Sequence, residues 1–301
     1  KRLMAHRIMG YTQMTLGAYG DARAEFQRGL ALYDPEAQAA YVAAHGEDPG
    51  LWCYAYLSWV EDWLGNRDAA LRWSETGVAL SRDLPNRYSR SFSLGLAAYL
   101  HRWRGDAAAT LAAAEEAKAE AESQGIAQFG AWADVVRGWA VAAHGDIAGG
   151  LALAEEGFAT WCALGLVHVQ WRHLVLLADI HRMEGAFDPA LARVAEAEAQ
   201  QNPENTGLGI ADLHLMKGTL LIESGEAQAG EQALLYAKKI ACTQGARLFE
   251  LRAATGLARL WAQRGRQEAA HRVLAPLLAE RLEGGDTADL REAMALLPEL
   301  T

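Results

Sequence analysis

Apolar residues along the chain fall into stretches with helical periodicity, and single glycines separate these stretches at a constant interval. No segment shows the sustained alternation of apolar and polar residues that is typical of a half-buried strand. The pattern therefore predicts an all-α fold. Six of the glycines lie 40 residues apart, and a seventh begins the pattern 48 residues earlier: Gly17, Gly65, Gly105, Gly145, Gly185, Gly225 and Gly265.

The residues around these glycines predict a turn between two antiparallel helices. Glycine takes a positive φ without a Cβ penalty, so it is the expected residue just past a helix. Aspartates follow where the next helix should begin, as caps for its free N–H groups, and Pro189 would then occupy a first helical position. These aspartates are Asp68, Asp106, Asp146 and Asp188.

Small residues recur at fixed distances from the glycines, in one column for each helix of a pair. Two helices that carry such columns can approach closely and pack ridges into grooves. This is the logic of the tetratricopeptide repeat (TPR), whose usual period is about 34 residues. The two columns are Gly10, Ser58, Ala98, Gly138, Ala178, Gly218 and Ala258, and then Gly77, Ala117, Gly157, Ala197 and Ala237.

We therefore expect a single TPR-like helical-repeat domain over residues 1–301, an α–α superhelix of about seven hairpins with a period near 40 residues. Pro276 should kink or end the last hairpin's second helix, because proline lacks a backbone donor. The hairpins are expected near 3–33, 50–83, 88–124, 127–164, 166–201, 206–244 and 247–282, with an insertion at 34–49 and a C-terminal capping helix at 286–297.

Composition and charge narrow the classes of partner. Lys and Arg number 28 against 38 Asp and Glu, a net charge of −10, which argues against direct nucleic-acid binding and against anionic membranes. Three cysteines without a Cys-x-x-Cys pair indicate neither a disulfide framework nor a zinc knuckle. No apolar run reaches the length of a membrane span. A cytoplasmic setting is expected.

The first helix of each pair should line the concave surface of the superhelix, and residues seven and eleven apart share one helix face. In the second to fourth hairpins eight of these nine inward positions are aromatic, all but Ala143: Trp52, Trp59, Trp63, Phe92, Tyr99, Trp103, Trp132 and Trp139. In the next three hairpins they are largely charged or polar and include Arg172, Asp179, Asp212, Arg252 and Arg259.

This face has two interpretations. It could be a concave binding groove for a peptide, a partner helix or a small ligand with an apolar part, in which Arg172 would hold an acidic group or stack on Trp132. The aromatic residues could instead pack between neighbouring repeats as core. No set of nucleophile, base and orienting group is visible, and His181 with Glu184 is a single pair rather than a metal site. We therefore expect no catalytic residue, metal or cofactor.

Several segments resemble the C-terminal TPR-like region of large bacterial signalling ATPases that are fused to adenylate or guanylate cyclase domains or to winged-helix domains. The resemblance spans the chain and implies a sensor or scaffold arm whose cyclase and ATPase motifs lie in upstream domains of a longer protein. The segments that carry it are AHRIMG at 5–10, GLALYDP at 29–35, GEDPG at 46–50, RGWA at 137–140, LHLMKG at 213–218 and GDTADLREA at 285–293.

Three functions follow from these observations. The first is a non-catalytic regulatory domain that binds a partner protein, a peptide or its own upstream switch domain on the concave face. The second is a sensor in which the groove binds a small-molecule effector. The third is a rigid scaffold or dimerisation arm. For the regulatory domain, the first hairpin should present an unpaired apolar edge to an upstream neighbour, because terminal repeats need a polar cap.

Overall fold

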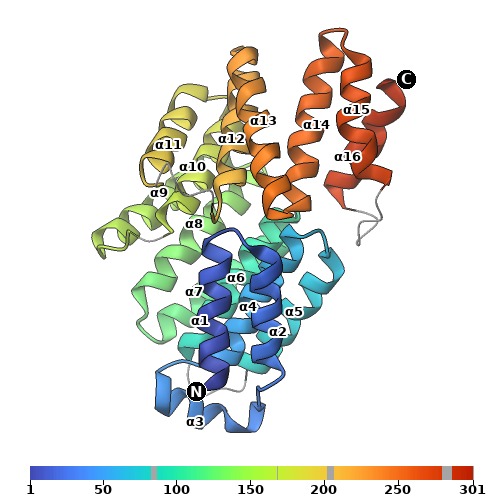
Figure 1. Cartoon of the computed structure of the whole chain (residues 1–301). Coiled ribbons are helices and arrows are strands. Elements are labelled where there is room, and N and C mark those ends of the chain that lie inside the picture. The colour runs from blue at the N-terminus through green and yellow to red at the C-terminus, as the bar shows by residue number, and fades with distance from the viewer. Residues whose placement is uncertain (83–86, 168, 202–206, 280–286, 301) are drawn as a thin grey trace.

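The computed structural model describes residues 1–82, 87–167, 169–201, 207–279 and 287–300. These residues form sixteen α-helices and two short 3-10 helices, with no strand among them. Successive helices pair into antiparallel hairpins that wind into a superhelix (Figure 1). The prediction of an all-α, TPR-like solenoid is confirmed. None of the described helices combines the length and the apolar character needed to cross a bilayer.

Seven helix pairs follow one another along the chain, and α16 (Ala288–Leu296) packs against the last pair together with the 3-10 helix η2 (Leu297–Leu300). The predicted boundaries at 83, 206, 282 and 286 lie outside the described residues. The first helices are α1 (Arg2–Thr15), α4 (Pro49–Trp63), α6 (Arg87–Trp103), α8 (Ala127–Ala143), α10 (Gln170–Glu184), α12 (Ile210–Glu223) and α14 (Arg247–Gln263). The second helices are α2 (Tyr19–Leu30), α5 (Arg67–Ser81), α7 (Ala107–Ser123), α9 (Ile147–Ala163), α11 (Phe187–Ala199), α13 (Ala227–Gln244) and α15 (Gln267–Ala279). Between the first two pairs lie the 3-10 helix η1 (Pro35–Ala37) and α3 (Gln38–His45).

The periodic glycines end the first helices, as the sequence predicts. All seven have a positive φ, between 71° and 105°. Asp106 and Asp146 cap the helices that follow, each accepting a 2.9 Å hydrogen bond from the backbone N–H three residues further on. The cap prediction is wrong for Asp68 and Asp188, which lie in the first turn of α5 and α11. The turn places the cap directly after the glycine, whereas these two aspartates stand three residues after it.

Pro276 does not end its helix at once. It lies inside α15, which continues for three residues to Ala279. The neighbouring side chains of Leu274 and Leu277 are buried. Their burial favours a continuous helix and offsets the single backbone hydrogen bond that proline removes.

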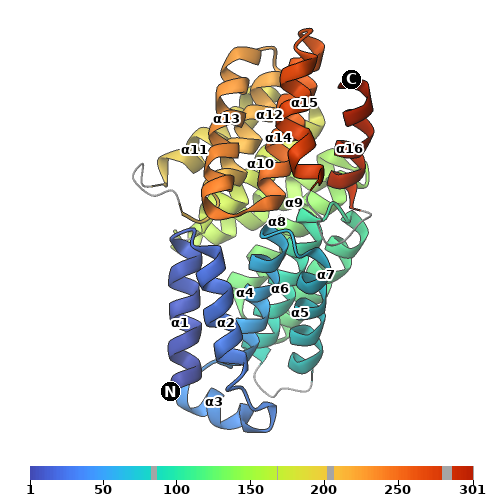
Figure 2. The same ribbon diagram turned by 45° about the vertical axis from the view of Figure 1, so that its right-hand side comes forward.

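The superhelix closes on itself. The upper end of the α1–α2 hairpin lies beneath α12 to α14 in both views (Figures 1 and 2). The backbone N–H of Leu208 donates a 3.0 Å hydrogen bond to the carbonyl of Thr15, and the rings of Trp63 and Phe249 lie 6.3 Å apart. The first two pairs therefore contact the sixth and seventh, so the first helices surround an interior instead of lining an open groove.

Helices α8 and α9 approach closely at Gly138, which belongs to the first small-residue column. A Cβ atom built on Gly138 of α8 would lie 2.4 Å from the carbonyl oxygen of Gly150 and 2.6 Å from the backbone nitrogen of Ala154, both in α9. Because these neighbours are backbone atoms, the helices would have to separate to admit a side chain.

We predict that Gly138→Ala lowers the free energy of unfolding by about 1–3 kcal/mol, through overpacking at this crossing. Gly20→Ala in α2 is the matched control, because a Cβ atom there meets nothing within 4 Å. It should stabilise the chain by about 0.5–1 kcal/mol. Urea denaturation of both variants measures the difference, and equal effects would contradict the close approach of α8 and α9.

Candidate functional site

The inward-facing residues line two separate spaces. The first has a volume of about 290 Å³ and is walled by Trp52, Phe92, Trp132 and Arg172, together with residues of α1; we call it the aromatic cavity. The second has a volume of about 360 Å³, and we call it the polar pocket. Its charged residues are Arg102, Asp179, Arg182, Asp212, Glu223, Arg252, Arg259, Asp289 and Glu292.

Four of the predicted aromatic residues line neither space. Trp59, Trp63, Tyr99 and Trp103 are at most 2% exposed. Their rings contact one another across α4 and α6, with centroids 4.8 Å apart for Trp59 and Trp103 and 5.2 Å apart for Trp63 and Trp103. Packing between neighbouring repeats therefore accounts for these four residues.

The aromatic cavity is built from successive first helices. Trp52 of α4 stacks on Phe92 of α6, with centroids 3.7 Å apart and an interplanar angle of 13°. Trp132 of α8 meets the edge of Phe92, with centroids 6.2 Å apart. Helix α1 contributes Arg7 and Tyr11, which the sequence analysis did not select. The period offers a signal for Tyr11, because it stands six residues before Gly17, as Trp59 stands before Gly65.

Arg172 of α10 reaches this aromatic layer. Its guanidinium carbon lies 4.8 Å from the ring centroid of Trp59, 5.5 Å from that of Tyr99 and 5.6 Å from that of Trp132. The residue is 8% exposed, and burial lowers the pKa of its guanidinium. The predicted contact between Arg172 and Trp132 is therefore present.

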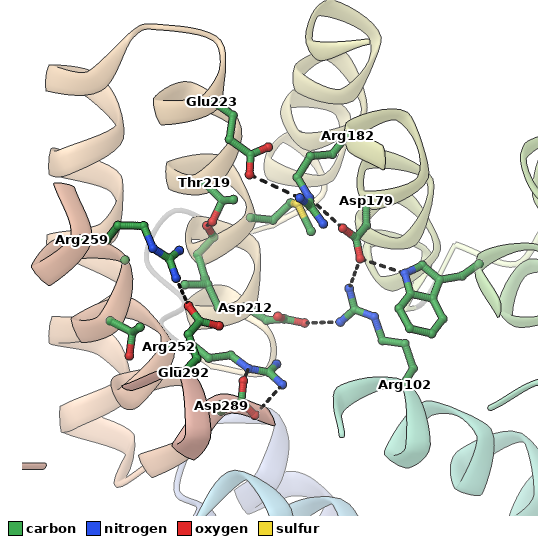
Figure 3. A pocket seen from close by; sticks show the side chains of 15 residues that line it. Arg102, Asp179, Arg182, Asp212, Thr219, Glu223, Arg252, Arg259, Asp289 and Glu292 are labelled. Carbon is green, nitrogen blue, oxygen red and sulfur yellow. Dashed lines mark hydrogen bonds and ion pairs between the residues drawn. The ribbon is translucent and has the colours of Figure 1, made fainter. Parts of the chain in front are cut away.

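The polar pocket holds a chain of ion pairs, drawn in Figure 3. Arg102 of α6 lies between two carboxylates, 3.2 Å from Asp179 and 3.9 Å from Asp212. Arg182 of α10 donates to Asp179 at 3.0 Å and to Glu223 of α12 at 3.3 Å. Two indole N–H groups also donate hydrogen bonds to these carboxylates. Trp139 donates to Asp179 at 2.8 Å, and Trp103 donates to Asp212 at 3.2 Å.

At the other side of the pocket, α14 pairs with α16 (Figure 3). Arg252 binds Asp289 through two hydrogen bonds of 2.7 and 3.1 Å, and Arg259 pairs with Glu292. Asp289 also accepts a 2.9 Å hydrogen bond from Arg67 of α5, 222 residues away. The same carboxylate thus holds the second and seventh helix pairs together.

The arginines determine the ionisation of the buried carboxylates. Burial opposes the charged form of Asp179, but Arg102 and Arg182 outweigh it and hold its pKa below the usual value. Burial also opposes ionisation of Asp289, where Arg252 and Arg67 again lower the pKa. Both side chains are therefore carboxylates at neutral pH.

The inward positions expected from the sequence do not include Arg102, Arg182 and Asp289. The first two share a column three residues before the periodic glycines, next to the inward column that holds Trp63 and Trp103. Asp289 belongs to the capping helix, and no repeat pattern relates that helix to the pocket. Among the described residues, no group of three or more His, Cys, Asp and Glu side chains has a geometry that could hold a metal ion.

We predict that Asp179→Asn destabilises the chain by about 3 kcal/mol at pH 7, because it leaves Arg102 and Arg182 short of a buried counter-charge. The folded-state pKa of Asp179 lies below that of the unfolded chain. Its stabilisation is therefore fully present above about pH 5 and disappears as the pH falls through the folded-state value. Urea denaturation from pH 7 down to pH 2 should show the two proteins converging in acid.

Glu268→Gln is the control for this titration, because the side chain of Glu268 is 85% exposed in its pair with Arg272. It should leave stability within about 0.5 kcal/mol of the wild type. A constant gap between wild type and Asp179→Asn across the whole pH range would contradict the lowered pKa.

Comparison with known proteins identifies the fold. No protein-family model matches the chain, and no curated protein matches it either. Among solved structures, the apo form of RapI is similar with a TM-score of 0.56 and 8% identity, covering 100% of this chain and 99% of that one. A Rap protein complexed with competence and sporulation factor is similar with a TM-score of 0.58 and 8% identity. That match covers 99% of this chain and 97% of the Rap chain.

A signal transduction ATPase with numerous domains that has a tetratricopeptide repeat sensor, from Pyrococcus horikoshii, is also similar. The TM-score is 0.54 at 9% identity, and the match covers 97% of this chain but 43% of that one. At these identities the likeness establishes architecture alone. The chain has the fold of the TPR and Rap helical-repeat solenoids.

Proposed function

We propose that the chain is a non-catalytic regulatory domain that binds a partner protein or peptide in the polar pocket. The observation that carries this proposal is the chain of ion pairs that crosses from α6 through α10 and α12, and from α14 to α16. Each pair joins helices of different repeats, or a repeat and the capping helix, so a ligand that exchanges partners with them would alter how these helices stack.

The ion pairs of the pocket differ in how easily they exchange. Arg102 and Asp179 are buried, with side chains 8% and 10% exposed, so their pairing is fixed by the cost of leaving either charge alone. Arg259 and Glu292 are 52% and 48% exposed. An exposed pair contributes only about 0–1 kcal/mol, so charged groups of a partner can replace it at little cost. The pocket therefore favours a peptide segment that carries both an acidic and a basic side chain.

We propose further that the parent is a larger cytoplasmic signalling protein, an ATPase coupled to a cyclase or to a winged-helix regulator. The segments described above resemble the C-terminal region of such proteins, and the similar Pyrococcus horikoshii protein is a signal transduction ATPase with a tetratricopeptide repeat sensor. Upstream domains would pack on the first hairpin, where Ile8, Met9 and Leu16 are 50%, 48% and 61% exposed. The coding sequence upstream of Lys1 tests this, and an unrelated neighbour without nucleotide-binding motifs would refute it.

Peptide arrays test the pocket itself. We expect the chain to bind short peptides of mixed charge, and we expect Arg182→Gln combined with Arg259→Gln to weaken that binding at least tenfold. Arg272→Gln is the matched control, because Arg272 is 68% exposed on α15 and pairs with Glu268, one turn earlier on the same helix. Binding that is equal in all three proteins, or absent from all of them, would overturn the proposed function.

A further inference from the structure

Arg172 differs from the other arginines that face the interior. In the described part of the chain, Arg67, Arg102, Arg182 and Arg252 each pair with at least one carboxylate. Arg172 pairs with none there and donates no side-chain hydrogen bond, and its Nε is buried without a partner. A buried guanidinium without a counter-charge is strongly unfavourable, so this position requires an explanation beyond packing.

The contacts of the Arg172 guanidinium group are made through its flat faces and not through its N–H donors. Trp59, Tyr99 and Trp132 supply ring contacts. Cation–π contacts compensate a buried charge in part, but they leave the N–H donors in the guanidinium plane without acceptors. A carboxylate is the acceptor whose two oxygens match this planar fork.

The cavity beside Arg172 is suited to a small organic ligand. Its volume of about 290 Å³ is near the lower end of the range for ligand sites. Phe92, Phe129 and Trp132 wall it, so a flat apolar group would stack on rings on several sides. Trp52 lines the same space, and its buried indole N–H has no hydrogen-bond partner among the described residues.

The backbone conformation at the start of α10 is a second observation that indicates a ligand site. Val169, which also lines the cavity, has a φ of 57°. A β-branched residue is strained in this left-handed region, and such strain concentrates at ligand sites. The strained residue stands three positions before Arg172, in the turn that introduces the helix.

We propose that the aromatic cavity is a binding site for a small aromatic monocarboxylate, whose carboxylate pairs with Arg172 while its ring packs between Phe92, Phe129 and Trp132. This site is distinct from the polar pocket and does not depend on the proposed function of that pocket. Helices α1, α4, α6, α8 and α10 all contribute to the cavity, so an occupant would fix the relative positions of the first five helix pairs.

Isothermal titration calorimetry with named probes tests the proposal on the whole chain. The probes are indole-3-acetate and benzoate, with indole-3-acetamide as the neutral analogue of the first. We expect at least one carboxylate to bind and, in a parallel thermal unfolding measurement, to raise the melting temperature. Indole-3-acetate should bind at least tenfold more tightly than its amide. The proposal would be overturned if neither indole-3-acetate nor benzoate bound at millimolar concentration. Equal binding of indole-3-acetate and indole-3-acetamide would also overturn it.

Variants of Arg172 separate ligand binding from a structural role. Arg172→Gln should abolish the stabilisation by carboxylate while leaving the ligand-free melting temperature unchanged or higher, because an unpaired buried charge has been removed. A purely structural Arg172 predicts the reverse, a lower melting temperature with no change in carboxylate binding. Arg172→Lys keeps the positive charge but loses the planar pair of N–H donors that matches a carboxylate. It should therefore bind the carboxylate more weakly than the wild type and more tightly than Arg172→Gln.

Arg266→Gln is the matched control, because Arg266 also lies over a ring, 4.7 Å from the centroid of Trp261, but outside the cavity and paired with Glu231. It should bind the carboxylates as the wild type does. Peptide binding by Arg172→Gln distinguishes the two sites: this variant should bind mixed-charge peptides normally. A variant that loses both ligands would show that Arg172 supports the whole superhelix, which would refute the separate cavity.

Discussion

The superhelix closes on itself through the carboxylate of Asp289. Arg67 reaches it from the second helix pair and Arg252 from the seventh, and the side chain of the aspartate is only 15% exposed. Removing it would leave two poorly solvated cations next to each other, which is far more costly than losing an exposed ion pair. Since this contact joins positions 222 residues apart, the curvature of all the repeats between them has to accommodate it.

Closure changes the physical character of the inner surface. In an open solenoid the first helices would face water, and the residues on them could remain unpaired. Once the ends meet, the same positions are desolvated, and every polar group there needs a partner. The chain largely meets this demand with aromatic packing in its first half and with ion pairs between helices of different repeats in its second half; Arg172 is the exception.

Helices α8 and α10 contribute residues to both the aromatic cavity and the polar pocket. Helix α8 places Trp132 in the aromatic cavity and Trp139 in the polar pocket, and α10 places Arg172 in the first and Asp179 in the second. The residues of each pair stand seven positions apart, so two turns of one helix connect the spaces. The two spaces therefore share two of their walls.

The sequence by itself determined the all-α class, the repeat period and the helix that faces inward. These follow from local chemistry: glycine is needed wherever the chain takes a positive φ, and small residues are needed wherever helices nearly touch, as Gly138 and Gly150 do. The sequence also selected Arg172, Asp179 and Arg252 among the inward residues. Only the tertiary structure decided that the groove is closed, that Trp59 and Trp103 are core, and that Arg172 lacks a counter-charge while Arg252 has one. Those outcomes depend on the sum of small rotations between repeats, which brings Asp289 to Arg67, and no local pattern encodes that sum.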